Sequence, residues 1–561
     1  MRQSSVPVVR PRRSLTNQMR FAMSVITAAV FAGTLAATAI ARQAATPDSR
    51  IDAVFAKYSR TTPGCSLGVS RKGAIVLETG YGMADLEHDV AIRPDTIFEA
   101  GSVSKQFTAA AILLLAREGK LSLDDPARKY VPELPDYGAP LTIRHMLTHT
   151  SGLRDWGNVA SIAGWPRGTR VHTHAQVLDI ISRQRSLNFP SGTRYSYCNT
   201  GYNLAAIIVE RVSGQPFTEF TRTRIFEPLG MTRTSWRDDY TRIVKDRSIA
   251  YAESMSGFSM EMPFENVYGQ GGLLTTVGDL LRWAGNLSQP KVGDPAFVKE
   301  EQEPGRFNDG RQHGYALGLM IGTYQGMREV SHSGATAAYR AYLSSYPDRQ
   351  LAVAVLCNVG TGNATQFAHA VADVYLGAPP AGTSVSTNGS TRVAPSDALA
   401  GLYRRAGTGE PMSVVRAGDE LKIEPGPRLT ANSGTRFTSP NGSRYEFGAN
   451  ALRVTDTFGT VDEYALVQGE ELKTRSLADY AGTYDSDEAE TTLVAAVENG
   501  ALVLKRRPDS VIRLTPVYAD AFQSSLGFIR FRRSLGGQIV GLSVTQDRVW
   551  EMMFAKRGDS R

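Results

Sequence analysis

A change in the character of the chain between Gly377 and Pro395 constrains the fold more than any other feature. This stretch contains Gly, Ala, Pro, Ser and Thr with almost no large apolar residue, which is typical of a linker. The chain before it mixes helical and strand patterns, whereas the chain after it shows short alternating strands and turns. A chain of 561 residues that changes class at a linker is expected to form two or three domains.

Residues 44–376 are expected to form one domain with mixed secondary structure. Ser66–Glu78 predicts a hairpin around a turn that contains Gly, and Gln350–Leu356 predicts a strand near the other end of the domain. Between them, Lys105–Arg117 predicts a buried helix, because its Ala109–Ala116 run is apolar on all sides. Both ends of the domain therefore contribute strands, and helices lie between them.

The tail repeats itself in two units, 396–475 and 476–561. Ala400–Tyr403 in the first unit recurs as Ala481–Tyr484 in the second. Both units consist of short strands, such as Phe528–Phe531, and units this short are poorly stabilised alone. We therefore predict an all-β region that forms either one eight-stranded barrel shared by both copies or two small barrels that pack together.

Residues 1–41 are predicted to be a signal peptide. An Arg-bearing segment precedes the uncharged run Phe21–Ala41, and the small-residue pattern Ala39-Ile40-Ala41 stands before Arg42. A cleaved leader places the protein in the periplasm or outside the cell. The alternative is an uncleaved anchor, because the run is long enough to span a bilayer. Arg12-Arg13 leaves the choice between the Sec and the twin-arginine route open.

The charge balance gives no reason to expect a nucleic-acid partner. The formal net charge is +7, but five of these positive charges lie in a leader without Asp or Glu. The rest of the chain is nearly neutral and offers no polyanion-binding excess of charge. An apolar fraction of 42% fits an ordinary globular protein, so we expect no membrane insertion apart from an uncleaved leader.

Three cysteines are too few for a disulfide framework. The favoured interpretation is three buried thiols, and the alternative is a disulfide between Cys65 and Cys357, both of which lie in strand-like runs. His145 and His149 could share one helical face, but their pattern lacks the Glu of a zinc protease motif. We therefore expect neither a metal site nor an organic cofactor.

The candidate nucleophile lies at the start of the buried helix, in Ser102-Val103-Ser104-Lys105. Ser102 and Lys105 are three residues apart and share one helical face, so the amine can lie beside the hydroxyl. Burial disfavours the charged form of a lysine, and the N–H groups of a helix N-terminus stabilise an oxyanion. The pair therefore suits acyl transfer. The alternative is an N-capping Ser with an unrelated Lys.

Two further motifs carry groups suited to the same chemistry. Tyr197 and Asn199, two residues apart in a turn, offer a phenol that can move protons and an amide that can hold a carbonyl. His332 precedes Ser333-Gly334, where the Gly permits close backbone approach and the His can donate a hydrogen bond or a proton. Taken separately, these motifs also fit a buried Tyr, a capping Asn and a loop His.

Together and in this order, the three motifs resemble the serine β-lactamase and penicillin-binding-protein superfamily. The resemblance covers about residues 50–376 and includes three further stretches, Leu147–Leu153, Ile225–Met231 and Gly269–Leu273 with Asp279-Leu280. It implies an α+β fold, in which an antiparallel sheet flanked by helices combines strands from both ends of the domain. A helical lobe lies beside the sheet in such proteins, with the site between the two.

Carried over residue by residue, the resemblance implies Ser102 as the acylated nucleophile and Lys105 as its proton partner. It implies Tyr197 as the general base or acid and Asn199 as a contact to the substrate carbonyl. His332 is then the residue at the strand edge.

The implied oxyanion hole consists of the N–H groups of Ser102 and of Ala335, the residue after Gly334. One departure from the pattern is that β-lactamases carry Lys-Thr-Gly where this chain has His332-Ser333-Gly334. That substitution is usual in the peptidase and esterase branches, so we do not expect a dedicated β-lactamase.

The all-β tail makes D-aminopeptidases the most similar branch, since these carry lipocalin-like β-barrel domains after the catalytic domain. The resemblance implies a serine hydrolase that cleaves amide or peptide bonds of small D-amino-acid-containing substrates through an acyl-enzyme. The alternatives are a carboxylesterase, a D,D-carboxypeptidase or β-lactamase, or a non-catalytic binder of cell-wall fragments. The sequence leaves a homodimer open.

A D-aminopeptidase must accept a free amine near the nucleophile, which calls for a nearby hydrogen-bond acceptor. In such relatives a loop of the β tail reaches the cleft, and here the candidate is Tyr518–Gly527 with Asp520 as the acceptor. The alternative is that this stretch is only a turn, with Asp520 in solvent.

Overall fold

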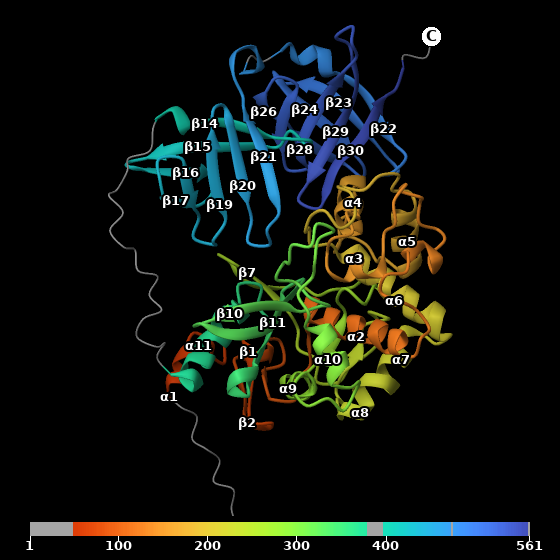
Figure 1. Ribbon diagram of the computed structural model, residues 1–561, viewed down its shortest axis with the longest axis vertical. Helices are drawn as coiled ribbons and strands as arrows, with labels where there is room; N and C mark the ends of the chain where they lie inside the picture. Colours follow the sequence, from red (N-terminus) through yellow and green to blue (C-terminus); the bar gives the residue numbers. More distant parts are fainter. Residues whose placement is uncertain (1–48, 378–396, 473–474, 559–561) are drawn as a thin grey trace, which may run out of the picture. The chain divides into compact units, whose positions relative to one another are not determined.

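The computed structural model describes residues 49–377, 397–472 and 475–558 (Figure 1). The predicted signal peptide and, apart from Gly377, the predicted linker lie outside the described residues. None of the described helices combines the length and the apolar character needed to cross a bilayer.

A six-stranded antiparallel sheet forms the framework of the first domain, in the order β10-β11-β12-β13-β1-β2 (Figure 1). Its strands are Met320–Tyr324 (β10), Met327–Thr336 (β11), Tyr339–Tyr346 (β12), Leu351–Cys357 (β13), Cys65–Arg71 (β1) and Ala74–Tyr81 (β2). β1 and β2 are the predicted hairpin, and β13 is the predicted strand from the far end of the domain. Because β1 pairs with β13, the two ends of the domain meet in the middle of the sheet.

Helices cover both faces of this sheet. Leu67 of β1 points into an apolar cluster with α1 (Ser49–Val54) and α11 (Ala364–Leu376). Its neighbour Gly68 points to the opposite face, where a Cβ would lie 2.9 Å from a side-chain carbon of α9 (Val277–Asn286). The glycine therefore lets α9 pack directly on the strand.

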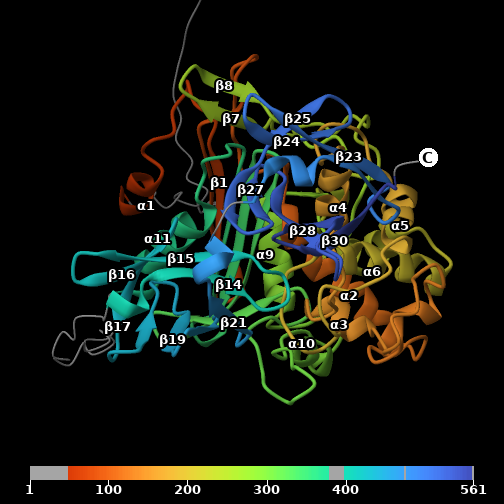
Figure 2. The ribbon, with the colours of Figure 1, turned by 90° about the horizontal axis from the view of Figure 1, so that it is seen from above.

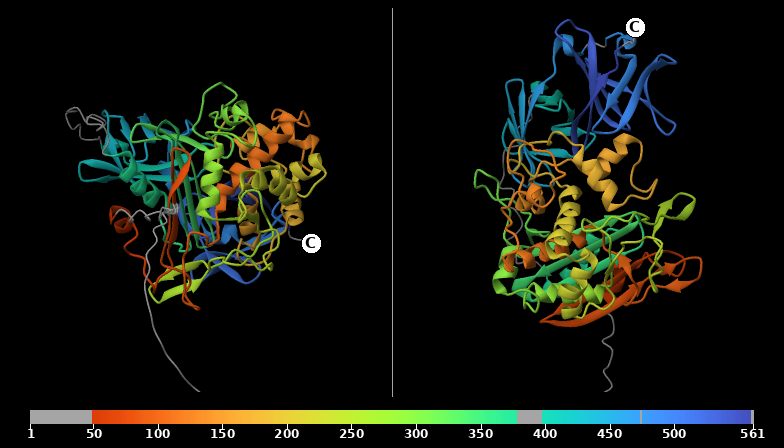
Figure 3. Two further views of the ribbon diagram at one scale, coloured as in Figure 1. Left: turned by 90° about the horizontal axis from the view of Figure 1, so that it is seen from below. Right: turned by 90° about the vertical axis from the view of Figure 1, so that its right-hand side faces the viewer.

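The helical lobe of the domain is built around the predicted buried helix, α2 (Ser104–Arg117), in which Ser104–Leu115 is entirely buried. Helices α2 to α7 gather beside the sheet (Figures 2 and 3). The other helices are α3 (Ile143–Leu147), α4 (Trp156–Ala163), α5 (His174–Ser182), α6 (Asn199–Ser213), α7 (Phe217–Thr221), α8 (Glu227–Leu229) and α10 (Pro295–Glu301). Short strands complete the domain: β3 (Met83–Asp85), β4 (Val90–Ala91), β5 (Phe98–Glu99), β6 (Ser235–Trp236), β7 (Tyr251–Ser254), β8 (Gly257–Met260) and β9 (Leu273–Thr275).

The first unit of the tail is a closed eight-stranded barrel, in which β14 pairs with β21. Its strands are β14 (Gly401–Arg405), β15 (Pro411–Ala417), β16 (Glu420–Glu424), β17 (Arg428–Ala431), β18 (Arg436–Thr438), β19 (Arg444–Gly448), β20 (Ala451–Thr455) and β21 (Val461–Leu466). Buried Tyr403, Phe437 and Phe447 fill its interior. The unit supplies all eight strands itself, so the alternative of one barrel shared by both copies is wrong.

The second unit is a nine-stranded sheet that does not close, because its terminal strands β25 and β26 do not pair with each other. Its strands are β22 (Gly482–Ser486), β23 (Thr491–Glu498), β24 (Ala501–Arg506), β25 (Ser510–Arg513), β26 (Thr515–Tyr518), β27 (Ala521–Ser524), β28 (Gly527–Arg533), β29 (Ile539–Gln546) and β30 (Val549–Lys556). The expectation of a second barrel is therefore corrected to an open sheet. The α+β class with an all-β tail is confirmed.

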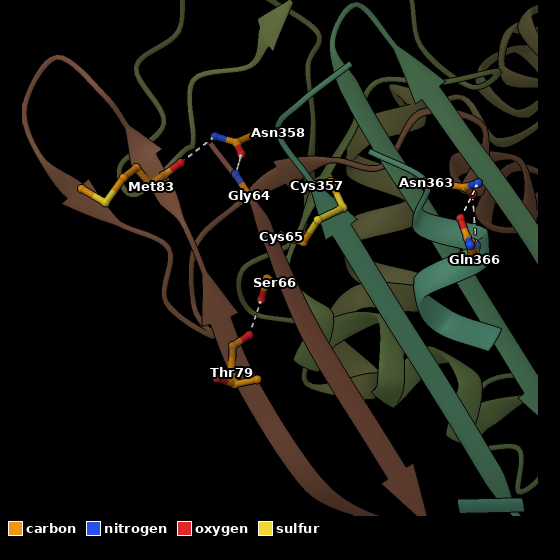
Figure 4. The surroundings of a disulfide bond; sticks show 9 residues. All are labelled: Gly64, Cys65, Ser66, Thr79, Met83, Cys357, Asn358, Asn363 and Gln366. Carbon is orange, nitrogen blue, oxygen red and sulfur yellow. Dashed lines mark hydrogen bonds between the residues drawn. A yellow bond between two sulfur atoms is a disulfide. The ribbon is translucent and has the colours of Figure 1, made fainter. Parts of the chain in front are cut away.

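Cys65 and Cys357 form a disulfide between β1 and β13 (Figure 4). The two residues are direct partners in the strand register, which brings their side chains to the same face of the sheet. Because these two cysteines are bonded to each other, the favoured interpretation of three buried thiols is wrong. Cys198 is the free, buried cysteine.

Candidate active site

A cleft of about 640 Å³ opens between the start of α2 and strand β11. Six of the predicted site residues line it, and they are Ser102, Tyr197, Asn199, His332, Gly334 and Ala335. Lys105 is fully buried and lies within hydrogen-bonding distance of the first of these. The fold therefore brings the three predicted motifs into one site.

Ser102 lies in a 3₁₀ turn, Gly101–Val103, that leads directly into α2. Lys105 Nζ is 3.0 Å from Ser102 Oγ, 2.9 Å from Asn199 Oδ1 and 2.7 Å from the carbonyl oxygen of Gln270. Burial lowers the pKa of Lys105 well below its ordinary value, and the positive charge of Arg548 adds to this effect. A neutral amine held by the two other acceptors can accept the proton of Ser102.

Tyr197 places its ring over the amine of Lys105, with Nζ 4.8 Å from the ring centroid. Its hydroxyl is buried and has no hydrogen-bond partner among the described residues. Burial raises the pKa of Tyr197, and the positive charge of Arg548 opposes this effect only in part. The phenol therefore stays protonated and can donate a proton within the cleft.

Asn199 is the first residue of α6, and its side chain holds the lysine. Its Oδ1 accepts from Lys105, and its backbone N–H donates to Asp155 Oδ2 at 2.8 Å. The predicted contact to a substrate carbonyl is therefore restricted to the side-chain nitrogen, which donates to none of the residues that the structure describes.

His332 is engaged by protein groups on both ring nitrogens. Nδ1 is 2.6 Å from the carbonyl of Ser333, which can only accept, so Nδ1 carries the proton. Nε2 therefore accepts from the hydroxyl of Tyr315 at 2.8 Å. Burial lowers the pKa of His332 to about 3. His332 therefore donates a hydrogen bond, as predicted, and its acceptor is the backbone carbonyl of Ser333 in strand β11.

The backbone of β11 lies directly against the turn that carries Ser102. A Cβ on Gly334 would lie 2.0 Å from the carbonyl oxygen of Ala100 and 3.1 Å from the backbone nitrogen of Ser102. The backbone nitrogen of Ala335 would lie 2.6 Å from a Cβ on Gly101. Only glycine permits this approach, which brings the two predicted oxyanion donors, Ser102 N–H and Ala335 N–H, close together.

Asp520 does not belong to the cleft. It lies in the turn between β26 and β27 and accepts from Arg533 Nη2 at 2.8 Å and from the Tyr480 hydroxyl at 3.0 Å. The predicted role is corrected, because the carboxylate is neutralised by an arginine of its own sheet.

Two other residues of the tail reach the cleft instead. Phe458, between β20 and β21, stacks on Tyr195 with ring centroids 3.9 Å apart. Arg548, between β29 and β30, lies over the ring of Tyr197 at 5.0 Å. The tail therefore forms part of the wall of the site, but through an aromatic ring and a cation.

No pattern in the sequence indicated these two residues or Tyr315. A turn residue far along the chain carries no local pattern that marks its contact with the catalytic domain. Gln270 lies within Gly269–Leu273, one of the stretches that carry the family resemblance, and its carbonyl oxygen accepts a hydrogen bond from Lys105. A buried His needs a hydrogen-bond partner, but no spacing in the sequence connects Tyr315 to His332.

An antiparallel sheet beside a helical lobe, with Ser and Lys one helical turn apart at their junction, defines the class of serine β-lactamases and penicillin-binding proteins. The model of the Beta-lactamase family matches residues 39–377, and the chain belongs to this family.

Known relatives agree with this assignment. A D-aminopeptidase from Brucella canis is 27% identical over 444 residues, which cover 78% of this chain and 82% of the relative. A D-aminopeptidase from Brucella anthropi is 26% identical over 503 residues, or 86% and 93% of the two chains. The solved octameric penicillin-binding protein homologue from Pyrococcus abyssi is 25% identical with a TM-score of 0.53, over 72% of this chain and 96% of that chain. The protein is a hydrolase of the serine β-lactamase and penicillin-binding-protein superfamily, similar to D-aminopeptidases.

Proposed function

We propose that the protein cleaves amide or peptide bonds of small D-amino-acid-containing substrates through an acyl-enzyme on Ser102. The observation that carries this proposal is the 3.0 Å contact between Ser102 Oγ and the fully buried amine of Lys105. A desolvated amine at this distance converts a weak nucleophile into a reactive one.

The reaction proceeds in two steps, acylation and deacylation. Ser102 Oγ forms a bond to the substrate carbonyl carbon while its proton passes to Lys105, and the oxyanion binds at Ser102 N–H and Ala335 N–H. The carbon–nitrogen bond then breaks. The proton held by Lys105 passes through the hydroxyl of Tyr197 to the leaving amine. Water attacks the ester in the second step, releases the acid and restores the hydroxyl of Ser102.

The names of the relatives support the substrate class. Two chains that match this one over most of their length are D-aminopeptidases. The match extends beyond the catalytic domain into the tail, since it covers 86% of this chain in one case. Phe458 and Arg548 of this tail line the cleft, which supports a substrate preference that depends on both parts of the chain.

The test is covalent labelling with a fluorescent fluorophosphonate, together with hydrolysis of N-acetyl-D-alanine p-nitroanilide. We expect Ser102→Ala to abolish labelling and to reduce turnover by about a thousandfold or more. Ser288→Ala, at an exposed serine away from the cleft, is the matched control and should retain both. Labelling that survives in Ser102→Ala would refute the assignment, and stable labelling without any turnover would show a binder instead of an enzyme.

A further inference from the structure

His149 is a buried titratable residue that the proposed mechanism does not use. It follows α3, which ends at Leu147, so it does not share a helical face with His145. The residue has no exposed surface and is not among the residues that line the cleft. Its ring packs against Tyr197, with the two ring centroids 4.1 Å apart. His149 therefore contacts the assigned proton donor without reaching the substrate.

His149 holds the backbone on both sides of Tyr197. Residues 194–198 have no regular secondary structure, so no helix or strand fixes this segment. The carbonyl oxygen of His149 accepts from the N–H of Ser196 at 2.9 Å, and His149 Nδ1 accepts from the N–H of Cys198 at 3.1 Å. One residue thus bonds to both neighbours of Tyr197 while its ring contacts the phenol ring.

This arrangement requires an unfavourable conformation at His149. Its φ is +57°, in the left-handed region that is uncommon for residues other than glycine. Because Nδ1 accepts a hydrogen bond, Nε2 carries the proton, and this buried donor has no partner among the described residues. A residue needed only for packing would require neither the strained backbone nor the unmet donor, so both point to a functional role.

The bond to Cys198 depends on a neutral ring. Burial lowers the pKa of His149 well below its ordinary value, and the neighbouring Lys105 adds to this effect. Nδ1 therefore stays free of a proton and remains an acceptor, whereas a protonated ring would have two donors and would lose this bond.

We propose that His149 is a positioning residue that holds the hydroxyl of Tyr197 in place for proton transfer to the leaving amine. It acts through the backbone on both sides of Tyr197 and through the face of its ring. A displacement of about 1 Å at a reacting group is enough to reduce a rate about a hundredfold. This inference rests on the proposed acyl-enzyme on Ser102 and on Tyr197 as the donor in that reaction.

The test compares two substrates that form the same acyl-enzyme. N-acetyl-D-alanine p-nitroanilide has a leaving nitrogen that takes a proton, whereas the p-nitrophenyl ester of N-acetyl-D-alanine releases a phenolate that needs none. Since kcat/KM reports acylation for both, its anilide-to-ester ratio measures proton delivery to the leaving group. General damage to the fold lowers both values and leaves the ratio unchanged.

Variants of His149 separate its hydrogen bond from its bulk. His149→Phe keeps a ring without an acceptor, and His149→Leu lacks both; each should reduce the ratio by about tenfold, the effect of one hydrogen bond. The two differ in volume, so a failure of one to fold leaves the other to carry the test. His149→Asn offers an Oδ1 acceptor and tolerates a positive φ. Its ratio should exceed that of His149→Phe by about threefold or more.

Two further comparisons assign the effect to Tyr197. Tyr197→Phe should reduce the ratio by about a hundredfold, and adding His149→Phe to it should cause no further loss, because both act on one hydroxyl. His174 is the matched control. Its Nε2 accepts from the N–H of Tyr268 at 3.0 Å, and its ring lies 4.0 Å from that tyrosine, outside the cleft. His174→Leu should leave the ratio unchanged.

The outcomes separate this inference from the proposed function. Labelling that depends on Ser102, together with an unchanged ratio in His149→Phe and His149→Leu, overturns the positioning role alone. The same conclusion follows if His149→Asn loses as much as His149→Phe, or if the double variant with Tyr197→Phe loses more than Tyr197→Phe. Labelling that does not depend on Ser102 overturns both proposals.

Discussion

Lys105 is the residue on which the chemistry of the cleft depends most directly. Its amine is surrounded by Ser102, Asn199 and the carbonyl of Gln270, and no carboxylate is among its hydrogen-bond partners. In such a site the charged form of a lysine is disfavoured, so the neutral amine is available as a proton acceptor.

Replacing this amine with a group that cannot lose its proton should stop acylation. We expect Lys105→Arg to reduce the rate of fluorophosphonate labelling about as much as Lys105→Ala, by a hundredfold or more, because a guanidinium stays charged. Stopped-flow labelling measures this rate. Lys120→Arg, at an exposed lysine, is the control, and near-normal labelling of Lys105→Arg would show that only a positive charge is needed.

The pH dependence of kcat/KM tests the same assignment. The amine accepts a proton only when it is neutral, so activity should rise as the pH increases through the pKa of Lys105. His332, with a pKa of about 3, remains neutral over this range and should not contribute. His332→Gln keeps one hydrogen-bond donor and one acceptor, so the acid limb of the kcat/KM profile should stay at the same pH. A displaced limb would show that His332 titrates during catalysis.

At the scale of elements, the site depends on a close contact between strand β11 and the turn Gly101–Val103. Gly334 is the position where this contact leaves no room for a side chain. We expect Gly334→Ala to slow labelling of Ser102 by about a hundredfold, the effect of losing one oxyanion donor. The Cβ must push the strand away from the backbone of Ala100.

A matched substitution exists on the neighbouring strand. A Cβ on Gly322, in β10, would meet nothing within 4 Å, so Gly322→Ala should leave the labelling rate unchanged. Comparable labelling rates in Gly334→Ala and Gly322→Ala would mean that β11 can shift without disturbing the oxyanion donors.

The elements that the sequence predicted are those with strong local patterns. The hairpin of β1 and β2, strand β13 and the apolar helix α2 all follow from short periodicities, and the motifs of Ser102, Tyr197 and His332 indicated the site. The sequence predicted barrels in the tail but not that the first copy closes by itself while the second stays open, because closure between β14 and β21 depends on pairing between segments without a shared local signal. The role of His332 was not predictable either, since Tyr315 occupies its second nitrogen only in the folded chain.

At the scale of the whole molecule, the nine-stranded sheet is joined to the catalytic domain through buried polar contacts. Arg154 precedes α4, and Glu488 lies between β22 and β23; the two form an ion pair with Nη1 and Oε1 2.9 Å apart. Their side chains are 2% and 12% exposed. Arg154 also donates to the carbonyl oxygen of Trp550, close to the turn that carries Arg548. The same region therefore holds the sheet in place and presents Arg548 to the cleft.

The stability of the chain should depend strongly on this pair. Glu488→Gln keeps the shape of the side chain but leaves the charge of Arg154 buried without its carboxylate, which costs about 3 kcal/mol in the free energy of unfolding. The neighbouring pair Arg185–Asp487 is the matched control, since both of its side chains are exposed, at 75% and 83%. Asp487→Asn should therefore change the free energy of unfolding by less than about 0.5 kcal/mol. Urea denaturation at pH 7 measures both variants, and equal stability losses would mean that the buried pair does not hold the sheet to the domain.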